Sequence, residues 1–131
     1  MPYHFEFDPV HKILLVVLEG KVLGWEVEKY HQELALQMER LDPAALICDY
    51  SAVTHLDMSA SAIRELARKD QTWPESIHRF IVAQTPHVFG LARMYALYAD
   101  RPADALQPVH SRAEALAALG IGDLQFEPAT V

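Results

Sequence analysis

Residues 46–54 read LICDYSAVT and lead into LDMS at residues 56–59. Residues 45–49 are almost entirely apolar, which predicts a strand buried on both faces. The more polar residues 50–55 are expected to form a loop, and a helix is predicted at about residues 59–69. A buried strand that leads into a helix in this way indicates an α/β fold with a largely parallel sheet.

The residues before this segment predict two paired strands and a helix. Residues 3–8 alternate between apolar and polar side chains, as in a strand with one buried face. Residues 13–18 are apolar without interruption, which predicts a strand covered on both faces that ends at Gly20. Because only a short turn separates these strands, we expect them to pair antiparallel. Residues 25–41 carry apolar side chains at steps of three and four, which predicts a helix with one buried face.

The residues after it predict two more strands, each followed by a helix. Strands are expected at residues 77–84 and 107–110. A proline begins the first of the two helices, at residues 86–100. A capping-box sequence begins the second, which a glycine ends, at residues 111–120.

The predicted order is β-β-α-β-α-β-α-β-α. Strands that alternate with helices indicate a mixed, mainly parallel sheet with helices packed on both of its faces. No internal repeat and no linker composition divides the chain. We therefore predict a single domain, residues 1–121, followed by a C-terminal tail, residues 122–131.

This order resembles the STAS fold of bacterial anti-sigma-factor antagonists, and the local sequences resemble its SpoIIAA-like branch. The resemblance covers nearly the whole chain and is carried by residues 46–59 and by FGLARM at residues 89–94. It implies a STAS-like domain that acts by binding a protein partner, as a regulatory or scaffolding module without catalytic activity.

The resemblance also implies a site at the start of the second helix. In the antagonists, an Asp-Ser-Ser-Gly segment there carries the serine whose phosphorylation switches partner binding. Asp57 matches the aspartate and Ser59 takes the position of the phosphorylated serine. Met58 and Ala60 depart from the pattern, because they stand in place of the first serine and the glycine.

Two interpretations of these residues remain open. A phosphate on Ser59 would gain from the exposed amides and the positive dipole end of the helix that it begins. Alternatively, Ser59 or Asp57 only caps that helix. Asp49, Thr85 and His87 are expected beyond the carboxyl ends of parallel strands, where α/β sheets bind ligands, although the first two residues also suit purely local capping of loops and helix starts.

Composition argues against several classes of partner. The chain has 131 residues, with 11 Lys and Arg against 18 Asp and Glu, for a formal net charge of -7. This balance disfavours nucleic acid and anionic membranes, which clustered basic residues bind. The first residues lack the pattern of a secretory signal, and the single cysteine, Cys48, is expected in the core. We expect a soluble, cytoplasmic protein.

Catalytic and metal sites are not expected. Asp57, Ser59 and His87 suggest a Ser/His hydrolase only as a remote alternative, since the G-x-S-x-G elbow is missing. The seven histidines lack metal-ligand spacing, and no cofactor motif occurs.

The helix predicted at residues 86–100 is apolar on nearly every side, with Arg93 and Met94 in its middle. Either neighbouring segments cover it, or its outer face binds a protein partner or a second copy in a homodimer. A further alternative is a carrier or sensor of a small apolar ligand, held between the second and third helices near Trp73 or Phe89.

Overall fold

The computed structural model of the chain describes residues 2–122 and 126–129. Its elements follow the predicted order, with a 3-10 helix and a short sixth strand in addition. In chain order they are β1 Tyr3–Asp8, β2 Ile13–Leu23, α1 Gly24–Leu41, β3 Ala45–Asp57, α2 Ala60–Lys69, η1 Asp70–Thr72, β4 His78–Val82, α3 Pro86–Ala99, β5 Leu106–Val109, α4 Arg112–Leu119 and β6 Glu127–Pro128.

The six strands form one mixed sheet in the order β5-β4-β3-β2-β1-β6. β1 and β2 pair antiparallel, with Tyr3 opposite Leu18 and Asp8 opposite Ile13, as predicted. β2, β3, β4 and β5 run parallel to one another. The predicted α/β class is therefore confirmed, and the four parallel strands direct their carboxyl ends to the same edge of the sheet.

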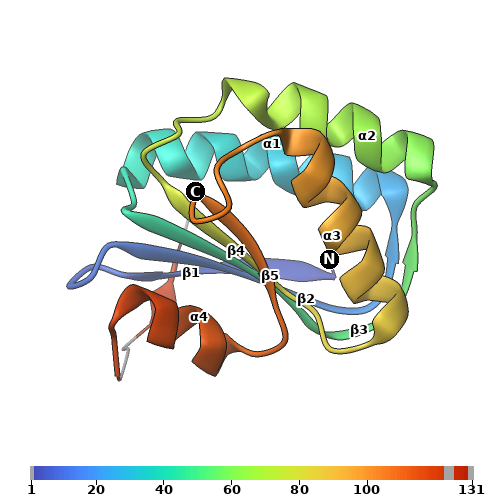
Figure 1. The fold of residues 1–131 in the computed structure, drawn as a ribbon. Helices are drawn as coiled ribbons and strands as arrows, with labels where there is room; N and C mark the ends of the chain where they lie inside the picture. Colours follow the sequence, from blue (N-terminus) through green and yellow to red (C-terminus); the bar gives the residue numbers. More distant parts are fainter. Residues whose placement is uncertain (1, 123–125, 130–131) are drawn as a thin grey trace.

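Helices cover both faces of the sheet, but unequally (Figure 1). α1, α2 and α3 lie on one face, and α4 lies on the other. Alternate residues of β3 belong to different cores: Leu46 and Cys48 pack on the three-helix face, whereas Ala45 and Ile47 pack on the α4 face. Cys48 is a buried free thiol, as predicted. The sheet therefore separates any site on one face from the other face.

The expectation that β2 ends at Gly20 and that residues 50–55 form a loop is wrong. β2 continues to Leu23 and β3 to Asp57, and the two strands remain paired to these ends. Two register shifts interrupt this pairing, and such irregularities disturb the alternation of side chains that sequence patterns rely on. Gly20 lies at one of them with a φ of 72°, a left-handed conformation that glycine adopts without strain.

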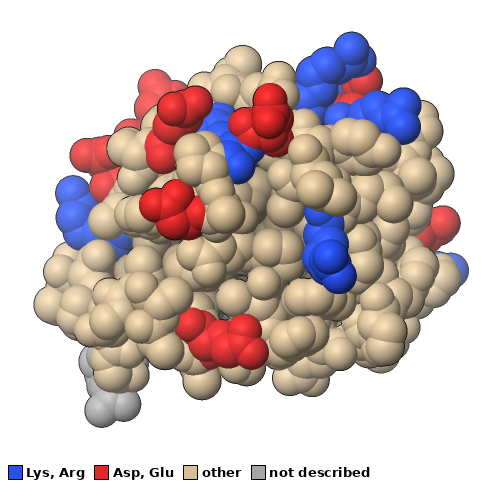
Figure 2. Space-filling view, viewed as in Figure 1, with Lys and Arg blue, Asp and Glu red and all other residues tan. Residues whose placement is uncertain are grey.

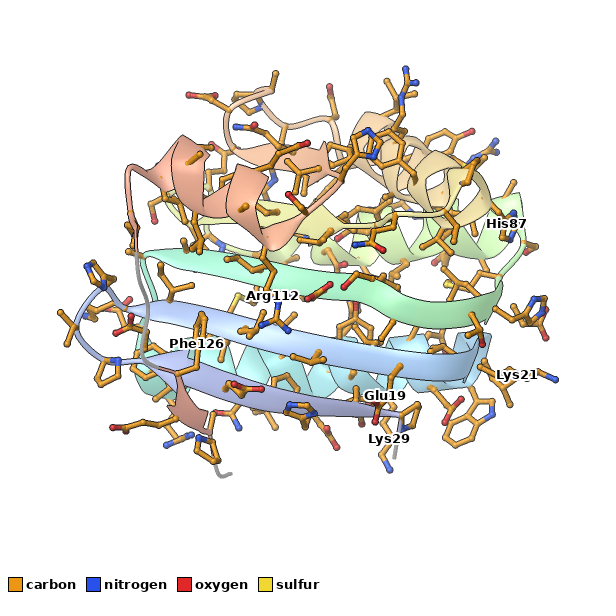
Figure 3. The ribbon with its side chains drawn as sticks, turned by 90° about the horizontal axis from the view of Figure 1, so that it is seen from below. Glu19, Lys21, Lys29, His87, Arg112 and Phe126 are labelled. Carbon is orange, nitrogen blue, oxygen red and sulfur yellow. The ribbon has the colours of Figure 1, made fainter. Side chains whose placement is uncertain are left out.

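The segment 122–131, predicted as a tail, contains the short strand β6. This strand pairs antiparallel with β1 and extends the sheet at that edge. Phe126, just before it, packs against the core of the α4 face, as Figure 3 shows from below. A strand of two residues has no periodicity from which the sequence could predict it.

α3 is covered only in part. Val88, Ala92, Tyr95 and Ala99 are buried toward the sheet, and α2 packs beside the helix. On the outer side, Leu97 is 78% exposed. Neighbouring segments therefore cover one side of this helix, and binding of a protein partner or a second copy at its exposed side stays a prediction. Among the described residues, no helix combines the length and the apolar character needed to cross a membrane.

Candidate functional site

The start of α2 lies directly beyond the end of β3, at the edge where the parallel strands end. Ser59 is the N-cap residue, and its Oγ accepts a hydrogen bond from the backbone N of Ala62 at 3.1 Å. This bond satisfies one of the free amides of the first turn, so helix capping is one role of Ser59. Ser59 and Asp57 are both exposed, which leaves the serine hydroxyl accessible from solvent.

Met58 turns inward between these two exposed residues. It is partly buried and packs against the core of the three-helix face. The turn also lies close to the start of α1, because a Cβ atom added to Gly24 would approach the carbonyl oxygen of Asp57 to 3.2 Å. Met58 therefore connects an exposed helix start with the interior beneath it.

The start of α3 lies at the same edge of the sheet. Thr85 is its N-cap residue and accepts a hydrogen bond from the backbone N of Val88 at 3.4 Å, and Pro86 occupies the first turn as predicted. His87 is exposed, and Figure 3 shows it at the edge of the sheet opposite to Phe126. The structure therefore brings the two helix starts, with Ser59 and His87, to one side of the molecule.

Arg93 and Met94 lie farther along α3. Arg93 is exposed, and Met94 is partly buried against the core. Figure 2 shows basic and acidic side chains side by side over α2 and mostly uncharged residues over α3. A partner that contacts both helices would therefore meet charged side chains on α2 and mostly uncharged side chains on α3.

Asp49 does not join this group. Its carboxylate pairs with Nε of Arg112 at the start of α4 and accepts hydrogen bonds from the backbone N and Oγ of Ser51 at 2.9 and 2.5 Å. Since α4 lies on the other face of the sheet (Figure 3), Asp49 points away from Ser59 and His87. The expectation that Asp49 lies beyond the carboxyl end of its strand, at one edge with Thr85 and His87, is wrong. β3 continues to Asp57, so Asp49 lies inside the strand, and the alternation of side chains along it directs Asp49 toward α4.

The hydrolase alternative gains no support from the geometry. In the part of the chain that the structure describes, no hydrogen bond joins Ser59 to Asp57 or His87. A nucleophilic serine needs a base within hydrogen-bond reach.

A buried polar network lies beneath the helices of the three-helix face. Nδ1 of His31, on α1, hydrogen bonds to Oδ2 of Asp70 at 2.7 Å. The hydroxyl of Tyr95, on α3, donates to the same carboxylate oxygen and accepts from Nη2 of Arg79 on β4. The Arg79 guanidinium also stacks over the ring of Trp73, 4.6 Å from its centroid. All five side chains are buried.

Sequence reasoning did not identify this network. Asp70 follows the solvated face of α2, and nothing in its local pattern distinguishes it from the charged residues before it. Arg79 offered the one available signal, because a basic residue inside an otherwise apolar strand requires a buried partner.

An apolar cavity lies between the sheet and the three helices, next to this network. The space open to the centre of a water-sized molecule measures about 40 Å³. Trp73 and Phe89 do not line it, and Phe89 instead stacks on His110. The lining residues are Val27, Tyr30, His31, Cys48, Tyr50, Leu56, Met58, Ile63, Leu66, Arg79, Ile81, Val88, Leu91, Ala92 and Tyr95.

Arg79 is the unusual member of this lining. It is 6% exposed, yet Nε and Nη1 have no hydrogen-bond partner among the described residues. A buried donor without an acceptor costs about 1–3 kcal/mol, and more when it is charged. The cavity wall therefore contains a cation whose hydrogen-bonding capacity is only partly used.

The Cys48 thiol and the three tyrosines of the cavity wall stay neutral. Burial raises the pKa of the Cys48 thiol to about 12 and raises the pKa values of Tyr30, Tyr50 and Tyr95 above their usual value of 10. Burial acts to lower the pKa of Arg79, but its interactions with Tyr95, Cys48 and Asp70 together more than offset this effect, so that the pKa lies above its ordinary value. Arg79 therefore remains positively charged.

No family model and no curated protein matches this chain. Several solved structures do match over most of its length. An anti-sigma factor antagonist from Mycobacterium paratuberculosis is 19% identical, with a TM-score of 0.66 over 90% of this chain and 92% of that one. An uncharacterised protein from Shewanella loihica PV-4 with a SpoIIAA-like fold is 16% identical, with a TM-score of 0.54 over 88% and 90% of the two chains.

The anti-sigma factor antagonist SpoIIAA matches as well. Its unphosphorylated form is 11% identical, with a TM-score of 0.59 over 90% of this chain and 97% of that one. The phosphorylated form of SpoIIAA from Bacillus has a TM-score of 0.53 at 12% identity, over 89% and 98% of the two chains. These matches confirm the predicted SpoIIAA-like STAS fold.

Proposed function

We propose that this chain is a non-catalytic, STAS-like regulatory or scaffolding module of the cytoplasm. It binds a protein partner at the side of the molecule where α2 and α3 begin, and phosphorylation of Ser59 switches this binding. The observation that carries the proposal is the exposed Ser59 at the N-cap of α2, in a fold shared with SpoIIAA, which has been solved with and without phosphate.

The electrostatics of the helix start support a switch. A phosphate on Ser59 would lie beside the free amides of the first turn of α2, which contains no acidic residue. It would add a charge of about -1.5 to -2 at neutral pH to a surface that a partner contacts. The nearby carboxylate of Asp57 is exposed, so solvent screens its repulsion of the phosphate.

The docking surface that we propose consists of Asp57, Ser59, His87, Arg93 and Leu97. All five are exposed, and they follow the starts and outer sides of two helices that pack together. The partly buried Met94 adds a side chain that adapts to different shapes. We also predict that the outer side of α3, which is part of this surface, forms the contact of a homodimer.

The test compares partners captured by four versions of the protein from lysates of cells that naturally produce it. They are the wild type, Ser59→Ala, Ser59→Asp and Ser61→Asp. Ser59→Asp retains an N-cap acceptor, so any change that it causes does not come from loss of the cap. Ser61 is an exposed residue of the same helix and controls for charge alone. We expect Ser59→Asp, but not Ser61→Asp, to change the captured set.

Mass spectrometry of the protein purified from the same cells supplies the second measurement. We expect phosphate on Ser59 and not on Ser61. Absence of phosphate from Ser59, together with the same partners for Ser59→Ala and Ser59→Asp, would count against the switch. If all four versions then capture the same partners, the protein is a partner-binding module that phosphorylation of Ser59 does not switch.

A second candidate function is uptake of a small apolar ligand, with the protein as a carrier or sensor. The cavity between the sheet and the helices supports this candidate, because its wall is mostly apolar. Met58 lies both in the cavity wall and in the turn next to Ser59, so an occupied cavity would affect the proposed docking surface.

A further inference from the structure

We propose that the cavity of the three-helix face binds a small apolar monocarboxylate, whose carboxylate group accepts hydrogen bonds from Arg79. The inference deepens the second candidate function and rests on it. It does not depend on phosphorylation of Ser59. It follows from three observations: an unsatisfied buried cation, an apolar wall around it, and a partly exposed rim at the other end.

The first observation concerns the hydrogen bonds of Arg79. A guanidinium has five N–H groups, and those on Nε and Nη1 account for three of them. None of these three has an acceptor among the described residues, whereas Nη2 donates to Tyr95. The unused donors belong to a residue of the cavity wall. A carboxylate matches the geometry and the charge of a guanidinium, and its small size suits the cavity.

The second observation is that Asp70 does not satisfy this cation directly. The hydroxyl of Tyr95 stands between the two charges, and His31 occupies the same carboxylate oxygen of Asp70. Arg79 and Asp70 therefore make no direct ion pair. The rings of Trp73 and Tyr95 lie next to the guanidinium, but they supply no acceptor for Nε or Nη1. A ligand carboxylate would complete the coordination of Arg79 without disturbing Asp70.

The third observation gives the orientation of the ligand. Arg79 is the second residue of β4 and is buried, whereas the partly exposed residues of the wall, Met58, Ile81 and Leu91, lie toward the carboxyl end of the strands. A ligand would thus enter beside Met58 and Leu91 with its carboxylate directed inward. Its hydrocarbon part would contact the apolar wall, including Ile63 and Val88.

The size of the cavity limits the ligand to a few carbon atoms. A space of about 40 Å³ for the centre of a water-sized molecule holds only a few atoms beyond a carboxylate. Butyrate is therefore a suitable probe, with 1-butanol and butylammonium as controls of equal chain length. Butanol lacks the charge, and butylammonium carries the opposite charge to the one that Arg79 attracts.

The test measures binding of each probe to the full chain by calorimetry and by shifts of backbone amide signals in NMR, at matched ionic strength. We expect butyrate to bind at least about tenfold more tightly than 1-butanol, since charge-assisted hydrogen bonds distinguish the two. The amide signals of residues around Arg79, Met58 and Leu91 should shift. Butylammonium should not bind.

Three variants locate the site. Leu91→Trp fills the rim of the cavity, and Leu36→Trp makes the same change at an exposed residue of α1 that does not line the cavity. We expect the first to abolish binding of butyrate and the second to leave it unchanged. Arg79→Met should remove the preference for butyrate over 1-butanol. Arg79→Met removes a buried group that supports the fold. If that variant does not fold, the comparison of Leu91→Trp with Leu36→Trp decides the test.

The outcomes distinguish the specificity for a carboxylate from the uptake of apolar ligands in general. Equal binding of butyrate and 1-butanol, both abolished by Leu91→Trp, would overturn the carboxylate specificity and leave a carrier of apolar ligands. No binding of either probe would overturn both. Binding of butyrate that survives Leu91→Trp would assign it to another site and would also overturn the proposal.

Discussion

Arg79 on β4 donates a hydrogen bond through Nη2 to the hydroxyl of Tyr95 on α3, across the interior of the three-helix face. The same hydroxyl donates to Asp70. One oxygen atom thus connects a strand, a helix and the segment after α2. The buried charges of Asp70 and Arg79 are compatible with the fold because both groups form hydrogen bonds. The donors on Nε and Nη1 of Arg79 are the exception.

Replacement of Tyr95 by Phe should destabilise the protein by about 2 kcal/mol, because it leaves a buried guanidinium donor without an acceptor and removes one of the two hydrogen bonds to Oδ2 of Asp70. Urea unfolding measures the free energy of unfolding. Tyr98→Phe is the matched control on the same helix: its hydroxyl accepts from Arg64 at the surface, so we expect a change within about 0.5 kcal/mol. Equal losses for the two variants would contradict a structural role for the Tyr95 hydroxyl.

The carboxylate of Asp8 should make stability depend on acid pH. Burial acts to raise its pKa, but hydrogen bonds from the His11 side chain and from the backbone N atoms of His11 and Val10 more than offset this, so that the folded pKa lies below the ordinary 3.8. A lowered pKa stabilises the folded state fully above the unfolded value, and this contribution is lost as the pH falls through the folded value.

The measurement is the free energy of unfolding of the wild type and of Asp8→Asn across this range. We expect the wild type to be more stable by about 1 kcal/mol at neutral pH. The difference should shrink as the pH falls below 3.8. If the difference in free energy of unfolding stays constant until the protein unfolds in acid, the charge of Asp8 does not contribute to stability.

The Cys48 thiol should be inert in the folded protein. Its burial raises the pKa to about 12, so that the reactive thiolate is almost absent at mildly alkaline pH. We expect iodoacetamide to modify Cys48 only as fast as the protein opens. Ser59→Cys provides an exposed comparison in the same chain, and its added thiol should react rapidly. Rapid modification of Cys48 in the native wild type would show that the cavity opens readily.

Two glycines in helices should respond differently to alanine. Nothing lies within 4 Å of a Cβ atom added to Gly90, in the middle of α3. Gly90→Ala should therefore stabilise the protein by about 0.5–1 kcal/mol, since alanine loses less backbone entropy on folding. The Cβ atom of Gly24→Ala would approach the Asp57 carbonyl oxygen to 3.2 Å, and we expect no such gain. Thermal unfolding compares the two, and equal gains would contradict the close approach of α1 to the turn before Ser59.

Much of the fold could be predicted from the sequence. The antiparallel pair β1 and β2, the order of helices and strands, and the starts of α2 and α3 follow from local signals, such as a short turn, capping residues and a proline. Each of these signals acts within a few residues, so a single chain contains it in full. The ends of β2 and β3 could not be predicted, because their polar residues stay in the sheet only through pairing with each other.

The candidate site divides in the same way. The sequence by itself determined Ser59 and Thr85 as helix starts at the carboxyl edge of the sheet, since capping depends on the amides of the adjoining turn. Only the tertiary structure decided that Asp49 faces α4, that β6 extends the sheet, and that His31, Asp70, Arg79 and Tyr95 meet beside an apolar cavity. These four residues come from separate elements, and contacts between distant segments form only when the sheet and helices pack together.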